Sequence, residues 1–132
     1  MAKKQLILVV DDEWLIVEFL VDQLEEAGFA VISEPSGNGA IATFDAHAKE
    51  VIALITDVRL GTGPSGWDVA HHARTCVPTM PVIYMTADSA AEWAANGVPN
   101  SILIQKPFVA AQVITAVSQL LNAQSSNPPP MS

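Results

Sequence analysis

Val51-Ile52-Ala53-Leu54-Ile55-Thr56-Asp57 is a short apolar run that ends in an acid. Three more apolar runs end at a charged or hydroxyl-bearing residue: 6–10 before Asp11 and Asp12, 82–85 before Thr86, and 102–105 before Lys106. Each run has the length of one strand and the continuous apolar character of a strand buried on both faces. Helical patterns separate the runs, an alternation that is typical of a parallel sheet. The polar residues after the strands should therefore meet at the carboxyl edge of one sheet, where open parallel sheets bind ligands.

The chain divides into five strand–helix units. We expect strands over residues 5–10, 30–33, 51–56, 82–86 and 101–105, and helices over 14–27, from after Gly39 to about 49, and over 67–74, 90–96 and 109–121. Because crossovers between parallel strands are right-handed, few windings are possible. The pattern predicts an α/β fold, a doubly wound five-stranded parallel sheet that is (βα)5 and flavodoxin-like, in strand order 2-1-3-4-5.

Composition restricts the class of protein. The chain has 132 residues, half of them apolar, which suits one compact domain over residues 1–122. Residues 123–132 are rich in Pro and Ser, so we expect a disordered tail there. A net charge of −8 argues against binding to nucleic acid or to an anionic membrane. The lone Cys76 excludes an internal disulfide and a metal cage of several cysteines. Neither a signal peptide nor a membrane span is recognisable, so we expect a cytoplasmic protein.

Asp11, Asp12 and Asp57 converge in the predicted winding, because the first and third strands are neighbours where the strand order reverses. Carboxylates so close repel one another unless one is protonated or a cation binds. Oxygen ligands with room for water suit Mg²⁺, and the pattern has no histidine or cysteine to favour zinc. A bound Mg²⁺ attracts phosphate, and Asp57 could then accept a phosphoryl group as an acyl phosphate. Lys106 and Thr86 would supply a positive charge and a hydroxyl to the phosphoryl oxygens.

Four motifs carry a resemblance to a known family: Val10-Asp11-Asp12-Glu13, the strand that ends in Asp57, Met85-Thr86-Ala87, and Lys106-Pro107-Phe108. Together, over about residues 5–121, they resemble the receiver domain of bacterial two-component response regulators. The resemblance implies that Asp57 is the phosphoacceptor, Lys106 the partner of the phosphoryl group, and Thr86 the switch hydroxyl. It also implies a cis Lys106–Pro107 bond. The implied Mg²⁺ ligands are Asp11, Asp12, Asp57 and the backbone carbonyl of Arg59.

The same resemblance implies a signalling module rather than an enzyme. A histidine kinase or a histidine phosphotransfer protein would donate the phosphoryl group, and the phosphorylated chain would contact a downstream protein or pass the group on. We expect a stand-alone receiver, because the chain ends soon after its last predicted helix. The surface formed by residues 90–96, 101–105 and 109–121 is the expected contact face and a candidate homodimer interface.

Some positions depart from the family pattern. Leu103 stands where the family often has an aromatic residue, three positions before the lysine. Tyr84, on the same side of its strand as Thr86, is a candidate replacement. The loop over residues 58–66 is one residue longer than is usual, and the short span after the fourth strand predicts a trimmed fourth helix.

For five further residues we predict a position or a role in the fold. Arg59 and Asp88 each lie two positions after a site residue, and we expect them to pair and to influence the lifetime of the phosphoryl group. His71 and His72 point to different sides of one helix and are expected on the surface. Cys76 is expected to be a small apolar filler.

The same residues are compatible with other functions. A phosphatase with an aspartyl-phosphate intermediate is the first alternative, although such enzymes usually have an Asp-x-Asp pair after the first strand. A receiver fragment of a hybrid histidine kinase is another. A flavodoxin-type FMN binder needs a hydroxyl-rich phosphate loop where this chain has Asp11-Asp12-Glu13. The intact acids and lysine disfavour a degenerate receiver that signals without phosphorylation.

Overall fold

The computed structural model describes residues 4–87 and 90–126. One sheet is formed by five strands: β1 (Leu6–Val10), β2 (Ala30–Glu34), β3 (Val51–Asp57), β4 (Val82–Thr86) and β5 (Ile102–Gln105). The strand order is β2-β1-β3-β4-β5, and every neighbouring pair is parallel. The predicted fold class and strand order are confirmed.

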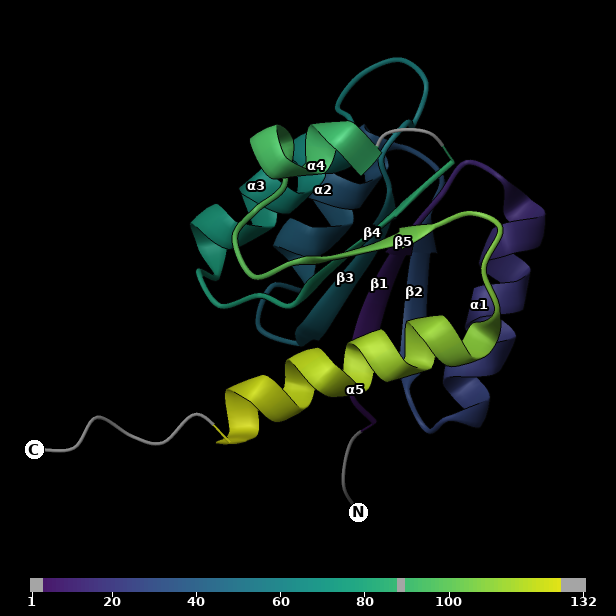
Figure 1. Cartoon of the computed structure of the whole chain (residues 1–132). Coiled ribbons are helices and arrows are strands. Elements are labelled where there is room, and N and C mark those ends of the chain that lie inside the picture. The colour runs from purple at the N-terminus through teal and green to yellow at the C-terminus, as the bar shows by residue number, and fades with distance from the viewer. Residues whose placement is uncertain (1–3, 88–89, 127–132) are drawn as a thin grey trace, which may run out of the picture.

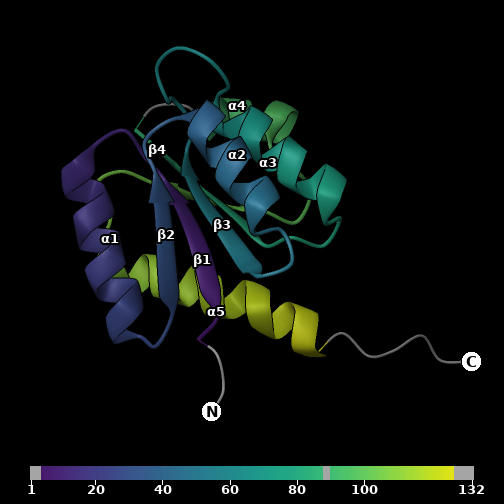
Figure 2. The same cartoon turned by 180° about the vertical axis from the view of Figure 1, so that it is seen from behind.

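Helices cover both faces of this sheet (Figures 1 and 2). They are α1 (Trp14–Glu26), α2 (Gly37–Ala46), α3 (Gly66–Cys76), α4 (Ala90–Asn96) and α5 (Ala110–Ser126). Helices α1 and α5 pack on one face, whereas α2 and α3 pack on the other. The winding reverses between β1 and β3, so the carboxyl ends of these two strands mark the topological switch point. In the part of the chain that the structure describes, no helix combines the length and the apolar character that a membrane span requires.

Side-chain caps account for two helix starts that differ from the expected ones. Helix α2 begins at Gly37, before the predicted position, because the Ser36 hydroxyl accepts a hydrogen bond from the Gly39 N–H at 3.0 Å. Helix α3 begins at Gly66 behind a capping box, in which Ser65 and Asp68 each accept from the other's backbone N–H.

The last helix is longer than predicted. Helix α5 ends at Ser126 rather than at residue 121, so the first residues of the expected tail are helical. Ala123 and Gln124 are good helix formers, and the first helix-breaking proline is Pro128. The rest of the predicted disordered tail, residues 127–132, lies outside the described part of the chain.

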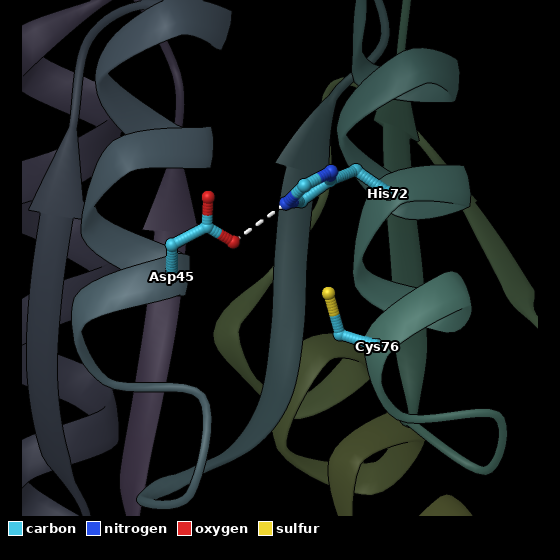
Figure 3. Close-up of side chains that lie close together, drawn as sticks. All are labelled: Asp45, His72 and Cys76. Atoms are coloured by element: carbon cyan, nitrogen blue, oxygen red, sulfur yellow. Dashed lines mark hydrogen bonds and ion pairs between the residues drawn. The ribbon is translucent and has the colours of Figure 1, made fainter.

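Helices α2 and α3 lie side by side and are joined by polar side chains (Figure 3). The His72 Nε2 of α3 lies 2.6 Å from the Asp45 Oδ1 of α2. His71 is on the surface as expected, with its Nε2 2.8 Å from the Asn96 carbonyl oxygen, and His72 is one-third exposed. Cys76 is exposed at the end of α3, so the expectation that it fills apolar space was wrong.

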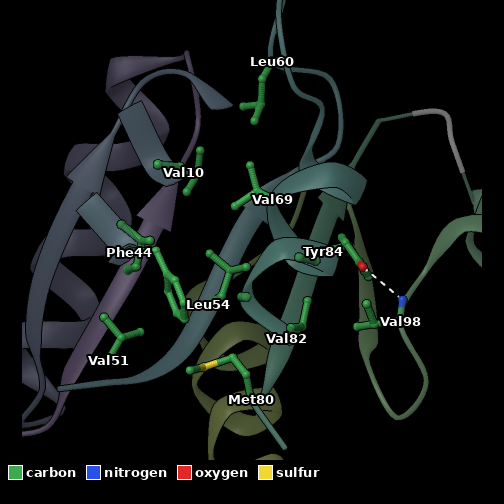
Figure 4. Close-up of a cluster of buried hydrophobic side chains, with 14 of the residues drawn as sticks. Val10, Phe44, Val51, Leu54, Leu60, Val69, Met80, Val82, Tyr84 and Val98 are labelled. Atoms are coloured by element: carbon green, nitrogen blue, oxygen red, sulfur yellow. Dashed lines mark hydrogen bonds between the residues drawn. The ribbon is translucent and has the colours of Figure 1, made fainter. Parts of the chain in front are cut away.

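The sheet separates two apolar cores. The core beneath α2 and α3 contains Phe44, Leu54, Val69 and Tyr84 (Figure 4). The core beneath α1 and α5 contains Leu20, Leu24, Val113 and Val117, four of the residues that the helical patterns assigned to buried faces. Burying each of these large side chains stabilises the fold by about 1.5–3 kcal/mol.

Tyr84 is held in place within the first of these cores. Its side chain is fully buried, its ring centroid lies 4.6 Å from that of Trp67, and its hydroxyl accepts a hydrogen bond from the Val98 N–H at 3.1 Å. Leu103 is half-buried against the same core. In this structure Tyr84 is therefore a buried core residue with a hydrogen-bonded hydroxyl group.

Candidate functional site

The parallel register brings the predicted site residues to one edge of the sheet. Val10 pairs with Thr56, so the residues that follow them, Asp11 and Asp57, emerge side by side. On the other side of β3, Thr86 pairs with Gln105 at the ends of β4 and β5. Lys106 follows β5 directly and donates its backbone N–H to the Thr86 carbonyl oxygen at 2.7 Å. The peptide bond between Lys106 and Pro107 is cis, as the resemblance implied.

Lys106 reaches across the edge to three carboxylates. Its Nζ lies 3.0 Å from Asp11 Oδ2, 3.3 Å from Asp57 Oδ2 and 3.2 Å from Glu13 Oε1. The side chains of Lys106, Asp11 and Asp57 are 12%, 0% and 10% exposed. The charge-assisted contacts with Asp11 and Asp57 are therefore shielded from water, and they hold the ammonium group against Asp57 Oδ2. The Glu13 side chain is 62% exposed.

The acids outnumber this cation. One oxygen from each of Asp11, Asp12, Glu13 and Asp57 lies within 4.8 Å of the others, so the cluster has an excess of three negative charges over Lys106 when all groups are ionised. The exposed Asp12 and Glu13 leave the cluster open to solvent on one side. Oxygen donors that are partly exposed and unbalanced in charge match the needs of Mg²⁺, which keeps several waters.

Glu13 is the member that sequence reasoning missed. It is the N-cap residue of α1, and its backbone N–H donates to Asp11 Oδ1 at 2.9 Å while its side chain reaches Lys106. The only signal in the sequence was its position directly after Asp12.

Burial changes the acid–base behaviour of the site. Burial, partly offset by a hydrogen bond from the Glu13 backbone and by Lys106, raises the pKa of Asp11. Burial and the nearby charge of Asp11 raise the pKa of Asp57. Burial alone would lower the pKa of Lys106, but its hydrogen bond to Asp11 and the charges of Asp11 and Asp57 outweigh this and leave that pKa raised. Lys106 therefore stays charged, whereas the raised pKa values of Asp11 and Asp57 mean that folding makes their ionisation less favourable.

Arg59 and Thr86 complete the walls of a pocket of about 310 Å³ at this edge, which Asp12, Asp57 and Lys106 also line. Thr86 is buried, and the Arg59 backbone N–H donates a hydrogen bond to the Asp57 carboxylate.

The Arg59 guanidinium lies 3.4 Å from Glu92 of α4, in an exposed ion pair. Asp88, the expected partner of Arg59, lies outside the described residues.

The raised carboxyl pKa values lead to a prediction about stability. An acid whose pKa is raised on folding favours the folded state below its unfolded pKa, and this contribution is lost as pH rises through the folded value. At pH 7 without divalent metal, Asp57→Asn should therefore raise the midpoint of thermal unfolding by about 4 °C, corresponding to about 1 kcal/mol. The gain should shrink as pH falls through the raised carboxyl pKa values and when Mg²⁺ neutralises the wild-type cluster.

Asp22→Asn is the matched control, because it makes the same chemical change at an exposed position of α1. Mg²⁺ should shift the unfolding midpoint of Asp22→Asn by the same amount as that of the wild type. If Asp57→Asn lowered the unfolding midpoint, or if Mg²⁺ left the wild-type midpoint unchanged, Lys106 would already neutralise the charge of the acidic cluster.

The chain is similar to known proteins in sequence and in structure. A family model described as the response regulator receiver domain matches residues 7–118. The crystal structure of a response regulator receiver protein from Sinorhizobium medicae WSM419 superposes with a TM-score of 0.89 at 44% identity, covering 92% of this chain and 98% of that one.

Two curated proteins are also similar in sequence. A probable transcriptional regulatory protein, TcrX of Mycobacterium tuberculosis, is 32% identical over 87% of this chain and 49% of its own length. The phyllosphere-induced regulator PhyR of Methylorubrum extorquens is 29% identical over 91% of this chain and 45% of its own length. The chain thus spans about half the length of the curated relatives it matches.

Proposed function

The chain belongs to the response regulator receiver domain family, and on that premise we propose that Asp57 is the phosphoacceptor of a two-component phosphorelay. The phosphoryl donor would be a phosphohistidine of a histidine kinase or a histidine phosphotransfer protein. The observation that supports this most strongly is the placement of the Asp57 carboxylate 3.3 Å from the Lys106 ammonium, inside an acidic cluster at the switch point of the sheet.

The transfer requires positioning and charge stabilisation. An Asp57 carboxylate oxygen attacks phosphorus as the bond from phosphorus to the donor imidazole nitrogen breaks, and the electron pair of that bond leaves with the imidazole. Lys106 stabilises negative charge on one phosphoryl oxygen, and the Thr86 hydroxyl donates to another. These groups come from three strand ends, so the sheet itself fixes their separation.

The acidic cluster fits a magnesium ion. Asp12 and Asp57 would bind Mg²⁺ directly, Asp11 partly through water, and the backbone carbonyl of Arg59 would complete the protein ligands. When bound, Mg²⁺ supplies positive charge that neutralises the phosphoryl oxygens. The raised pKa values of Asp11 and Asp57 support this assignment, because a group of buried carboxylates is stabilised by a cation.

The output would be a change of protein contacts on the surface formed by α4, β5 and α5. The Thr86 carbonyl accepts a hydrogen bond from the Lys106 N–H, so a movement of β4 at Thr86 would reach the start of the loop between β5 and α5. A downstream protein or a second copy of the chain would then bind this surface.

Intact-mass measurement tests the proposal. Incubation with acetyl phosphate and Mg²⁺ should add the mass of one phosphoryl group to the wild type and to Asp22→Asn, but not to Asp57→Asn. Chelation of Mg²⁺ should abolish the addition, because the oxygens of the incoming phosphoryl group would then face unneutralised carboxylates.

Other results would assign another function. An adduct retained by Asp57→Asn would place the acceptor elsewhere. Sustained release of phosphate from simple phosphate esters by the wild type would indicate the phosphatase alternative. A missing adduct, together with a failure of beryllofluoride to bind, would contradict the phosphoacceptor role.

A further inference from the structure

A second group of side chains that could bind a metal ion lies on α2 and α3, away from the cluster around Lys106. Asp45 is next to last in α2, and His72 and Cys76 lie in the second half of α3. In a parallel α/β sheet the helices run opposite to the strands, so these helix ends lie toward the amino edge of the sheet. Figure 3 shows the three side chains converging between the two helices.

The geometry points to a transition-metal site, and we propose that Asp45, His72 and Cys76 bind Zn²⁺. One ligand atom from each residue lies within 4.8 Å of the other two. The proposal is independent of Asp57 and of the phosphorelay, since no residue is shared between the two sites.

Helical spacing aims two of the ligands at the same place. His72 and Cys76 are four residues apart in α3, and positions i and i+4 are neighbours on one helix face. Helix α2 packs beside that face and contributes Asp45. Two rigid elements therefore present three ligands without the help of a loop.

The site must rearrange slightly to bind zinc. Bonds from zinc to oxygen, nitrogen and sulfur of about 2.0–2.3 Å in a tetrahedron place neighbouring ligand atoms about 3.4–3.6 Å apart. His72 Nε2 and Asp45 Oδ1 are now 2.6 Å apart, so they would have to separate by about 1 Å to admit the ion. Both side chains are partly exposed, at 33% and 53%, and can make this adjustment by small rotations.

The donor set selects a different ion from the one proposed for Asp57. Sulfur, nitrogen and oxygen together suit Zn²⁺, whereas the hard Mg²⁺ ion prefers oxygen alone. Three protein ligands leave the fourth position of a zinc tetrahedron to water. Without a metal, the same atoms would form a partly exposed pair between His72 and Asp45, and such pairs contribute little to stability.

Cobalt is a suitable probe because Cys76 is the only cysteine of the chain. The reduced full chain, freed of reductant and held in saturating Mg²⁺ to occupy the acidic cluster, would be titrated with Co²⁺. We expect a thiolate-to-cobalt charge-transfer band in the near ultraviolet that saturates at one ion per chain and is displaced by Zn²⁺. Oxygen ligands alone cannot produce this band.

Single substitutions separate the three-residue site from simple binding to a thiol. Cys76→Ser should abolish the band, and His72→Gln and Asp45→Asn should each weaken Co²⁺ binding at least 10-fold. His71→Gln should leave binding unchanged, because His71 is the adjacent histidine on the same helix but contacts Asn96. Circular dichroism would confirm that every variant is folded.

Three outcomes would overturn the proposal. The first is the absence of the band in the folded wild type at saturating Co²⁺. The second is a band that survives both His72→Gln and Asp45→Asn, which would indicate that the cysteine alone binds the ion. The third is saturation at one ion per two chains, with a matching increase in molecular mass, which would assign the ion to a bridge between copies.

Discussion

Lys106→Met should slow the phosphorylation of Asp57 by acetyl phosphate at least about 100-fold at a fixed Mg²⁺ concentration. The Lys106 Nζ lies 3.3 Å from Asp57 Oδ2 and is largely shielded from water, and removing one preorganised charge-stabilising group of this kind costs about 10²–10³ in rate. Methionine keeps much of the side-chain volume, so loss of charge is the main change. Time courses of intact mass would give the rate.

Two comparisons separate this effect from damage to the fold. Lys49→Met removes an exposed lysine before β3 and should be phosphorylated at the wild-type rate. Mg²⁺ should bind to Lys106→Met more tightly than to the wild type, because the ion no longer competes with the ammonium group for Asp11 and Asp57. An unchanged rate, or weaker Mg²⁺ binding, would show that Lys106 is only a structural counter-charge.

Gly66→Ala should destabilise the fold by about 3 kcal/mol and disturb the proposed phosphorylation site at the same time. A Cβ atom at this first position of α3 would lie 2.0 Å from the Asp57 carbonyl oxygen and 2.9 Å from the Val58 Cα. Both atoms belong to the backbone, so the strand end itself must move, and forced repacking of this kind costs up to about 3 kcal/mol. Urea unfolding would measure the loss, and intact mass would report a slower phosphorylation.

Gly39→Ala is the matched control within α2. Its Cβ would come within 2.6 Å of the Glu34 Oε1, the end of a side chain that can shift at the expense of the hydrogen bond it accepts from the Thr43 hydroxyl. Alanine is also favoured over glycine in a helix by about 0.5–1 kcal/mol. The free energy of unfolding should therefore stay within about 1 kcal/mol of the wild type. Equal losses for the two variants would mean that the close contact at Gly66 relaxes easily.

Most of the fold could be predicted because its buried strands are continuous apolar runs that end in polar residues. The expected β4 agrees with the structure at both ends, and the other strands agree to within one residue. Helix ends were less predictable, because they depend on local bonds and propensities. Ser36 extends α2 backward by a side-chain cap, and α5 continues to Ser126 because nothing before Pro128 stops it.

The main site was predictable for the same reason, since parallel strands deliver the residues after them to a single edge. What the sequence could not show was the position of side chains that depend on packing. Glu13 joins the cluster because its N-cap position at the start of α1 brings its side chain to Lys106, and Tyr84 lies in the core in contact with Val98 and Trp67. Asp45 and His72 are 27 residues apart, and only the packing of α2 on α3 reveals that they meet.

The order of the strands has a consequence for the growing chain. Both neighbours of β1 are complete once residue 57 has been synthesised, and all four clustered acids are then present. Lys106 is added only after β4, α4 and β5. We infer that a nascent chain that pairs its first three strands on the ribosome forms the acidic edge of the sheet before Lys106 is present. Dissolved cations are then the first positive charges that can neutralise these acids.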